Sequence, residues 1–254
     1  MPLTPKHDLI LQARLGSTRL PQKILRPFWQ DDTILDVLLR RLKTAQNVHS
    51  IIVATTTNTE DDAIEARCAQ HGVACFRGEP DDVLQRFLDA MAFFRIETTI
   101  RICADNPFID IDLLDQLIAS VATEVDYASF KVDDTPAIRT HLGIFTEFIT
   151  ADALRRAIRL GATPFDREHV TKFVYEHPDD FRLQWLNPPD WLNKWRTVRL
   201  TVDTHQDFET AQQIYEWMMR HADGIVSLPS LEIALDALPH IQTKMRQEIE
   251  ANTK

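Results

Sequence analysis

A cluster of cationic residues follows the first apolar run of the chain, in the stretch LQARLGSTRLPQK at residues 11–23. Arg14, Arg19 and Lys23 lie there in a chain whose net charge is −10. Small and hydroxyl-bearing residues stand between them: Gly16, Ser17 and Thr18. Backbone N–H groups, hydroxyls and cations together bind phosphate-bearing anions, a triphosphate above all. Composition alone favours a solvated basic loop, so the position of the stretch in the fold must decide between these interpretations.

Two acidic residues stand directly after short apolar runs that are typical of strands. Asp105 follows residues 98–103 (TTIRIC), and Asp203 follows residues 199–202 (RLTV). Ligands of open α/β sheets bind at the carboxyl ends of the strands, and Mg²⁺ prefers carboxylate oxygens that it can bridge to phosphate. For Asp105 alone a turn residue before Pro107 is the slightly better interpretation, and Asp203 alone is not informative, since Thr204 or Asp207 can cap the helix that follows. Both together, with a basic loop on a third strand end, predict a phosphate–metal–nucleotide site.

Other polar residues stand where they could contact a nucleotide or an acceptor. The candidates at strand ends are Thr55, Arg77 and Gly78, and those in the middle of the chain are Arg139, His141, Arg167, Glu168 and His169. A threonine-rich stretch after a strand can bind a base or ribose, although a polar turn fits it as well. A histidine beside an arginine can bind an acidic substrate, although a lone histidine is more often structural. Asp110 and Asp112 form a DxD pair at the start of a predicted helix, where N-capping is the better interpretation.

The elements that position these residues alternate regularly in the first half of the chain. Strand patterns lie at 8–13, 50–54, 73–76 and 98–103, and helical patterns lie at 33–44, 60–71, 81–94 and 111–121. Such alternation predicts an α/β fold with a parallel, doubly wound sheet. In the second half we expect strands at 126–131, 141–145 and 199–202, and helices at 151–160, 167–176, 207–221 and 231–250, the last interrupted at Pro239.

The chain is expected to form one domain over residues 1–254. An insertion at about 131–195 is expected to act as a lid or a dimerisation element, with an ordinary surface excursion as the alternative. Helices over about 206–252 are expected to complete the domain.

Composition narrows the class of protein. The chain has 28 Lys and Arg against 38 Asp and Glu, which argues against a nucleic-acid partner. Its three cysteines match no zinc or redox motif, and no apolar run is long enough for a membrane span. The patterns GxxxxGK[ST] and GxGxxG are absent, which argues against P-loop and dinucleotide-binding enzymes. We expect a cytoplasmic protein that binds neither nucleic acid nor membranes.

The motifs taken together resemble those of a known family. QARLGSTRLPQK resembles the N-terminal signature of cytidylyltransferases that make CMP-activated sugar acids, especially the spore coat polysaccharide biosynthesis type of acylneuraminate cytidylyltransferase. Further blocks match in the same order: SIIVATTTNTEDDAIEA, VACFRGEPDDVLQRF, RICADNPFIDIDLLDQLI, REHVTKFVYEHP and RLTVDTHQDFE. The resemblance covers about residues 8–217. It implies a Rossmann-like, GT-A-type nucleotidyltransferase fold, with a mostly parallel central sheet and a middle insertion, in a homodimer.

The same resemblance implies an activity and roles for individual residues. Such enzymes transfer CMP from CTP to an acidic, nonulosonate-like sugar with Mg²⁺, release pyrophosphate, and serve the synthesis of cell-surface polysaccharides or glycoconjugates. The implied catalytic residues are Arg14, Lys23, Asp105 and Asp203, and the last two are the implied metal ligands. The implied nucleotide-binding residues are Gln12, Ala13, Arg14, Gly16, Ser17, Arg19, Lys23, Thr55, Arg77, Gly78 and Asp82. The acceptor sugar is expected to contact Arg139, His141, Arg167, Glu168 and His169.

The sequence departs from the family pattern in places, and other activities stay open. Gln22 stands where the family usually has glycine, and Ala-Asp-Asn-Pro at residues 104–107 replaces Gly-Asp-Cys-Pro. The middle region, which should select the acceptor, matches least. The alternatives are a nucleotidyltransferase acting on a phosphonate or a sugar phosphate, a GT-A glycosyltransferase, and a catalytically silent nucleotide-binding protein. The basic first loop favours a triphosphate over a diphosphate sugar, and the presence of both acids with Lys23 favours an enzyme.

Overall fold

A mostly parallel sheet forms the centre of the computed structural model, which describes residues 6–222 and 224–251. Its strands lie in the order β10 (Leu183–Leu186), β7 (Tyr127–Val132), β9 (Glu147–Thr150), β6 (Thr98–Cys103), β1 (His7–Gln12), β4 (Val48–Thr56) and β5 (Ala74–Gly78). Only β9 runs antiparallel to its neighbours along this order, and the short β8 (Thr135–Pro136) pairs antiparallel with β7. The predicted α/β fold with a mostly parallel sheet is confirmed.

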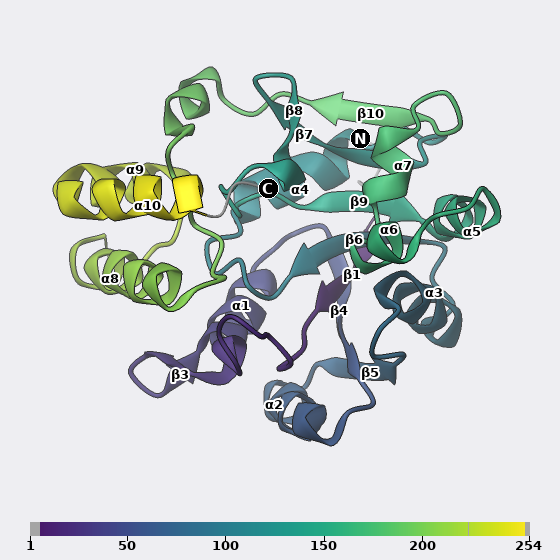
Figure 1. Cartoon of the computed structure of the whole chain (residues 1–254), viewed down its shortest axis with the longest axis horizontal. Coiled ribbons are helices and arrows are strands. Elements are labelled where there is room, and N and C mark those ends of the chain that lie inside the picture. The colour runs from purple at the N-terminus through teal and green to yellow at the C-terminus, as the bar shows by residue number, and fades with distance from the viewer. Residues whose placement is uncertain (1–5, 223, 252–254) are drawn as a thin grey trace.

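Helices cover both faces of this sheet (Figure 1). One face carries α1 (Ile34–Leu42), α4 (Ile111–Ser120), α8 (His205–His221), α9 (Leu228–Ala237) and α10 (Pro239–Ala251). The other carries α3 (Val83–Phe94), α5 (Ala151–Arg159) and α7 (Lys172–Glu176), with α6 (Pro164–Glu168) packed on α3 and α7. Along β1, Leu9 and Leu11 enter the first core and Ile10 enters the second. Because both faces are buried, the strand appears in the sequence as an unbroken apolar run.

The remaining elements are short. A hairpin is formed by β2 (Pro27–Trp29) and β3 (Asp32–Thr33), and α2 (Asp62–His71) lies beside α1 and β5. The short 3₁₀-helices are η1 (Lys23–Leu25), η2 (Thr59–Asp61), η3 (Ala137–Arg139) and the longer η4 (Asp190–Trp195). Among the described residues, no helix combines the length and apolarity needed to cross a bilayer.

The strand order creates a topological switch point between β1 and β6, at the carboxyl ends of these strands. The chain runs from β1 through β4 to β5 on one side, and then crosses to β6 on the other side of β1. The loops that follow β1 and β6 therefore diverge, and this switch point is where open α/β sheets bind ligands. Both the basic stretch and Asp105 follow these two strands directly.

Three predicted elements are wrong. Residues 141–145 form no strand, because the sheet strand begins at Glu147 after Gly143 takes a φ of +58°. Residues 199–202 form no strand either: the N–H groups of Leu200 and Val202 donate to the carbonyls of His141 and Asp105, both at 2.9 Å. Their apolar pattern reflects burial against the first core.

The predicted helix 167–176 is split into α6 and α7, and Val170 between them has a φ of +57°. The predicted interruption at Pro239 is confirmed, since α9 ends at Ala237 and α10 begins at Pro239. The middle segment supplies β9 and β10 to the central sheet, while its role as a lid or dimer contact stays a prediction.

Leu38 in α1 provides a test of the first core. Its side chain is fully buried, and truncation to alanine would leave a cavity that the surrounding helices and strands fill only in part. We expect Leu38→Ala to lower the free energy of unfolding by about 3 kcal/mol, measured by denaturant titration. Leu160→Ala is the matched control, because Leu160 is 52% exposed and should cost little. Equal effects of the two substitutions would contradict this packing.

Candidate active site

The loop after β1 is anchored at its apolar residues, which leaves its cations facing the cleft. Leu15 and Leu20 are buried, and the Leu15 N–H donates to the carboxylate of Asp61 at 2.8 Å. Asp61 also accepts from the Thr56 N–H at the end of β4, at 3.2 Å. The loop is thus tied to the neighbouring strand by a buried carboxylate.

Gln22 adopts a left-handed conformation, with φ +58° and ψ +21°. Its N–H donates to the Leu15 carbonyl at 3.2 Å and closes the loop. The left-handed region favours glycine, which accounts physically for the glycine expected at this position. The glutamine keeps the turn, so the following residue, Lys23, still enters the site.

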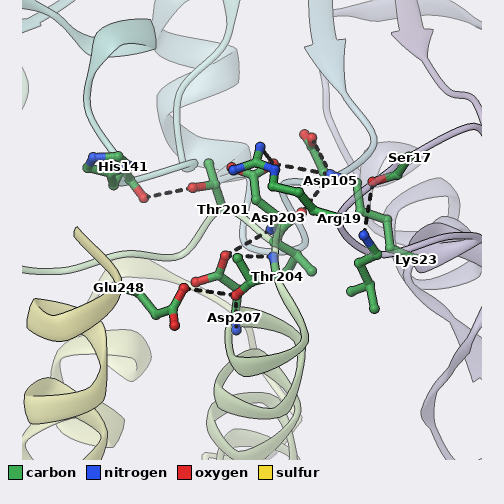
Figure 2. A network of polar contacts seen from close by, with 12 residues as sticks. Ser17, Arg19, Lys23, Asp105, His141, Thr201, Asp203, Thr204, Asp207 and Glu248 are labelled. Carbon is green, nitrogen blue, oxygen red and sulfur yellow. Dashed lines mark hydrogen bonds and ion pairs between the residues drawn. The ribbon is translucent and has the colours of Figure 1, made fainter. Parts of the chain in front are cut away.

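Lys23 joins Asp105, in the turn after β6, to Asp203, in the loop before α8 (Figure 2). Its ammonium group donates to Asp105 at 2.9 Å, to Asp203 at 3.3 Å and to the Val202 carbonyl at 2.7 Å. Burial alone would lower the pKa of Lys23, but the two carboxylates together raise it above its ordinary value of 10.5. Arg19 pairs with the same Asp203 at 3.2 Å. The basic stretch and both acids predicted from the sequence therefore meet at one point.

A buried arginine and aspartate hold Asp203 in place. Arg199 donates to Asp203 at 3.2 Å and to both oxygens of Asp207 at 2.7 and 2.8 Å. Burial alone would lower the pKa of Arg199, but Asp207 and Asp203 raise it above its ordinary value. Asp207 also accepts from the Asp203 and Thr204 N–H groups at 3.0 and 2.9 Å, and thereby caps α8. The sequence analysis missed Arg199, although its spacing of four from Asp203 is a usable signal.

A cavity of about 830 Å³ opens beside Lys23. The predicted residues that line it are Gln12, Ala13, Arg14, Gly16, Ser17, Arg19, Lys23, Asp105, Arg139, Glu168, His169 and Asp203. They come from the end of β1 and the loop after it, the turn after β6, the end of η3, α6 with the start of its connection to α7, and the loop before α8. The structure thus brings predicted nucleotide-binding and acceptor-binding residues to one cavity.

Other predicted residues lie outside the walls of this cavity: Thr55, Arg77, Gly78, Asp82, His141 and Arg167. Arg77 pairs with Glu65 at 3.0 Å and donates to the Thr56 carbonyl at 3.0 Å. Arg167 pairs with Asp82, which ties α6 to the start of α3.

The remaining three residues outside the cavity wall, Thr55, His141 and Gly78, have structural surroundings. Thr55 is fully buried in β4. The Nδ1 atom of His141 lies 2.6 Å from the Arg199 guanidinium, which in turn donates to Asp203. His141 therefore supports Asp203 through Arg199. A Cβ at Gly78 would lie 2.8 Å from the Phe76 ring, so the close packing there requires glycine.

A buried ion pair that the sequence analysis did not find lies in the wall of the cavity. Arg101 of β6 pairs with Glu147, its register partner in β9. Glu147 also accepts from the hydroxyls of Tyr127 and Thr171 at 2.7 and 2.8 Å. Burial and the Glu147 carboxylate raise the pKa of Tyr127, which therefore stays a proton donor. Arg101 interrupts the apolar run TTIRIC, and a charged residue inside a buried strand is a signal that could have indicated a buried partner.

Asp105 and Asp203 are the side chains here that could hold a divalent cation. Both reach the same ammonium group, so their oxygens converge on one point. No three His, Cys, Asp or Glu side chains gather in the way a metal would need anywhere in residues 6–222 and 224–251. Two carboxylates completed by water and phosphate oxygens form the type of donor set that suits Mg²⁺.

Removing the charge of Lys23 should destabilise the protein in a pH-dependent way. Lys23→Met keeps the alkyl stem but leaves the two acids without their shared cation, and should cost about 2 kcal/mol at neutral pH. Because the folded-state pKa lies above 10.5, this contribution is present at lower pH and is lost as the pH rises through the raised pKa. Denaturant titrations of both proteins at increasing pH measure the difference, and its disappearance by about pH 9 would contradict the ion-pair geometry.

Known proteins share this sequence and architecture. The pattern of the Cytidylyltransferase family matches residues 9–236. An uncharacterized protein of Methanocaldococcus jannaschii is 38% identical over 235 residues, which cover 92% of this chain and 91% of the relative. The spore coat polysaccharide biosynthesis protein SpsF of Bacillus subtilis is 34% identical over 240 residues, which cover 92% of this chain and 96% of the relative.

A solved structure agrees with these relatives. A cytidylyltransferase from Leptospira borgpetersenii superposes with a TM-score of 0.82 at 30% identity, over 93% of this chain and 96% of that one. The resemblance inferred from the motifs is confirmed at the level of this family. With its switch-point cavity, its cationic β1 loop and the converging carboxylates of Asp105 and Asp203, the chain belongs to the cytidylyltransferase family.

Proposed function

We propose that this protein transfers CMP from CTP to an acidic, nonulosonate-like sugar and releases pyrophosphate. The observation that carries the proposal is the convergence of Lys23, Asp105 and Asp203 at the switch point, beside a cavity that also admits an acceptor. The kinship with a spore coat polysaccharide biosynthesis protein supports a role in cell-surface polysaccharide or glycoconjugate synthesis. We further propose that the protein is a cytoplasmic homodimer.

The cations of the β1 loop suit a triphosphate. Arg14, Arg19 and Lys23 line one end of the cavity, and each is held there by a carboxylate of the same site. In the proposed reaction they neutralise the phosphates of CTP and the charge that builds on the leaving pyrophosphate. The neighbouring backbone N–H groups and the Ser17 hydroxyl add neutral donors.

The chemistry itself is an in-line displacement. An acceptor oxygen attacks the α-phosphorus, the bond from that phosphorus to the pyrophosphate oxygen breaks, and the pyrophosphate leaves with the electron pair. The protein contributes chiefly by positioning the reactants and stabilising charge. Asp105 and Asp203 would hold Mg²⁺, which, when bound, supplies Lewis-acid stabilisation of the α-phosphate.

An acidic acceptor is favoured by the charges at the other end of the cavity. Among the described lysines and arginines of the cavity wall, Arg139 is the one without an ion pair to a carboxylate. Arg139 is exposed, so it can bind an incoming anion without breaking an existing pair. One unpaired cation matches the single charge of a sugar carboxylate better than the double charge of a phosphate.

The activity is tested by measuring pyrophosphate release with CTP and a panel of acids: N-acetylneuraminate, pseudaminate, legionaminate and 3-deoxy-manno-octulosonate. We expect release with at least one acid and with CTP in clear preference to UTP, ATP and GTP. Thermal shift with the four nucleotides provides a control that needs no acceptor. Tight CTP binding without release from any acid would favour a catalytically silent protein.

Asp105 and Asp203 should both be needed for turnover. Asp105→Asn and Asp203→Asn keep the side-chain shape but remove the charge, and each should lower kcat by about 10²–10³-fold. Asp236→Asn, at an exposed position of α9, is the matched control. Circular dichroism should show that all three variants stay folded. Near-normal turnover of both site variants would refute the metal assignment.

A further inference from the structure

A valine in a left-handed backbone conformation separates α6 from α7. Val170 has a φ of +57°, and its side chain is fully buried in the second core. A β-branched residue rarely takes this conformation, because it is strained and persists only where the surrounding structure imposes it. Residues 165–177 contain neither glycine nor proline, so the break has no local cause of the usual kind. A contact from elsewhere in the fold must hold it.

That contact is a hydrogen bond from Thr171 to a buried carboxylate. The Thr171 hydroxyl donates to Glu147 at 2.8 Å, and both side chains are buried. Thr171 occupies the N-cap position of α7, where a threonine hydroxyl ordinarily accepts from the first turn of the helix, but it makes no such bond here. Arg101 and Tyr127 in turn hold Glu147 in the sheet. Glu147 is therefore a fixed point in β9, and Thr171 is turned toward it.

The break decides where the last residues of α6 lie. In an uninterrupted helix the Thr171 N–H would donate to the Arg167 carbonyl, four residues back, but it donates to the His169 carbonyl at 2.6 Å. Glu168 and His169 both line the cavity, and Glu168 pairs with Arg14 of the β1 loop at 3.3 Å. If α6 and α7 formed one straight helix, Glu168 and His169 would be displaced relative to that loop. The left-handed turn therefore sets the position of two cavity residues.

We propose that Thr171 is a positioning residue for the acceptor end of the cavity, acting through the left-handed turn at Val170. Its hydroxyl holds the turn, and the turn holds Glu168 and His169. The inference rests on the proposed function and goes beyond it, because Thr171 is fully buried outside the cavity wall and so acts without contacting a substrate. The β1 loop is anchored separately, through Asp61, so nucleotide binding should change little.

Thr171→Val tests the proposal, because it removes the hydroxyl and keeps the shape of the side chain. We expect the KM for the acid that supports release to rise about tenfold, while the KM for CTP and kcat each change less than about threefold. Thr171→Ser keeps the hydroxyl and should restore the acceptor KM to within about twofold. Thr210→Val is the matched control, since Thr210 is buried in α8 outside the cavity. Thr171→Ala is the second variant if Thr171→Val does not fold.

Nuclear magnetic resonance measures the turn itself without any substrate. The coupling between the N–H and Hα protons of residue 170 depends on φ, so it distinguishes the left-handed from the right-handed helical conformation. We expect the left-handed value in the parent protein and in Thr171→Ser, and a shift toward the right-handed value in Thr171→Val. A left-handed value in Thr171→Val overturns the proposal whatever the kinetics show.

The outcomes separate the positioning role from the reaction. If the parent protein turns over an acid, an unchanged acceptor KM in Thr171→Val, or an equal rise in both KM values, overturns the positioning role and leaves the proposed function standing. A serine variant that does not restore the acceptor KM has the same consequence. If no acid supports release in the parent protein, the proposed function is refuted, and the coupling alone decides whether Thr171 holds the turn. Unfolding of both Thr171→Val and Thr171→Ala makes the hydroxyl a general stabilising group and overturns the specific role.

Discussion

The site depends on one ammonium group shared by two carboxylates. Lys23 joins Asp105 and Asp203, which lie 82 and 180 positions further along the chain. Each contact closes a long loop, so together they bring the β1 loop, the end of β6 and the start of α8 to a single point. Without the ammonium group, the two carboxylates would repel each other. The close approach of Asp105 and Asp203 therefore depends on Lys23.

The position of Asp203 is stabilised by residues that do not line the cavity. Asp203 is held by Arg199, which is held in turn by Asp207 at the start of α8. Thr204 beside them donates to Glu248 of α10 at 3.0 Å, so the last helix of the fold supports the loop (Figure 2). The C-terminal helices therefore support the loop that carries Asp203 into the cavity.

Local sequence patterns predicted the strands and helices that depend on the order of neighbouring residues. They failed for features that depend on contacts with distant segments. Apolar runs and helical faces placed β1, β4, β5 and β6 and their helices within a few residues, since both faces of this sheet are buried. The Arg101–Glu147 pair escaped prediction because it depends on a register between strands 46 residues apart. The false strand at 199–202 has the burial of a strand but donates its N–H groups to loop carbonyls. Nothing in the four residues of this segment distinguishes a strand from a buried loop.

The cations of the β1 loop form ion pairs within the protein itself. Arg14 pairs with Glu168 at 3.3 Å, Arg19 with Asp203, and Lys23 with both Asp105 and Asp203. The pairs fix three long side chains before any ligand arrives, so less conformational entropy is lost on binding. In the proposed reaction, a triphosphate that enters the cavity would exchange one set of anionic partners for another. The carboxylates that it displaces, Asp105 and Asp203 among them, would then become available, which would couple occupation of the nucleotide site to assembly of the rest of the proposed active site.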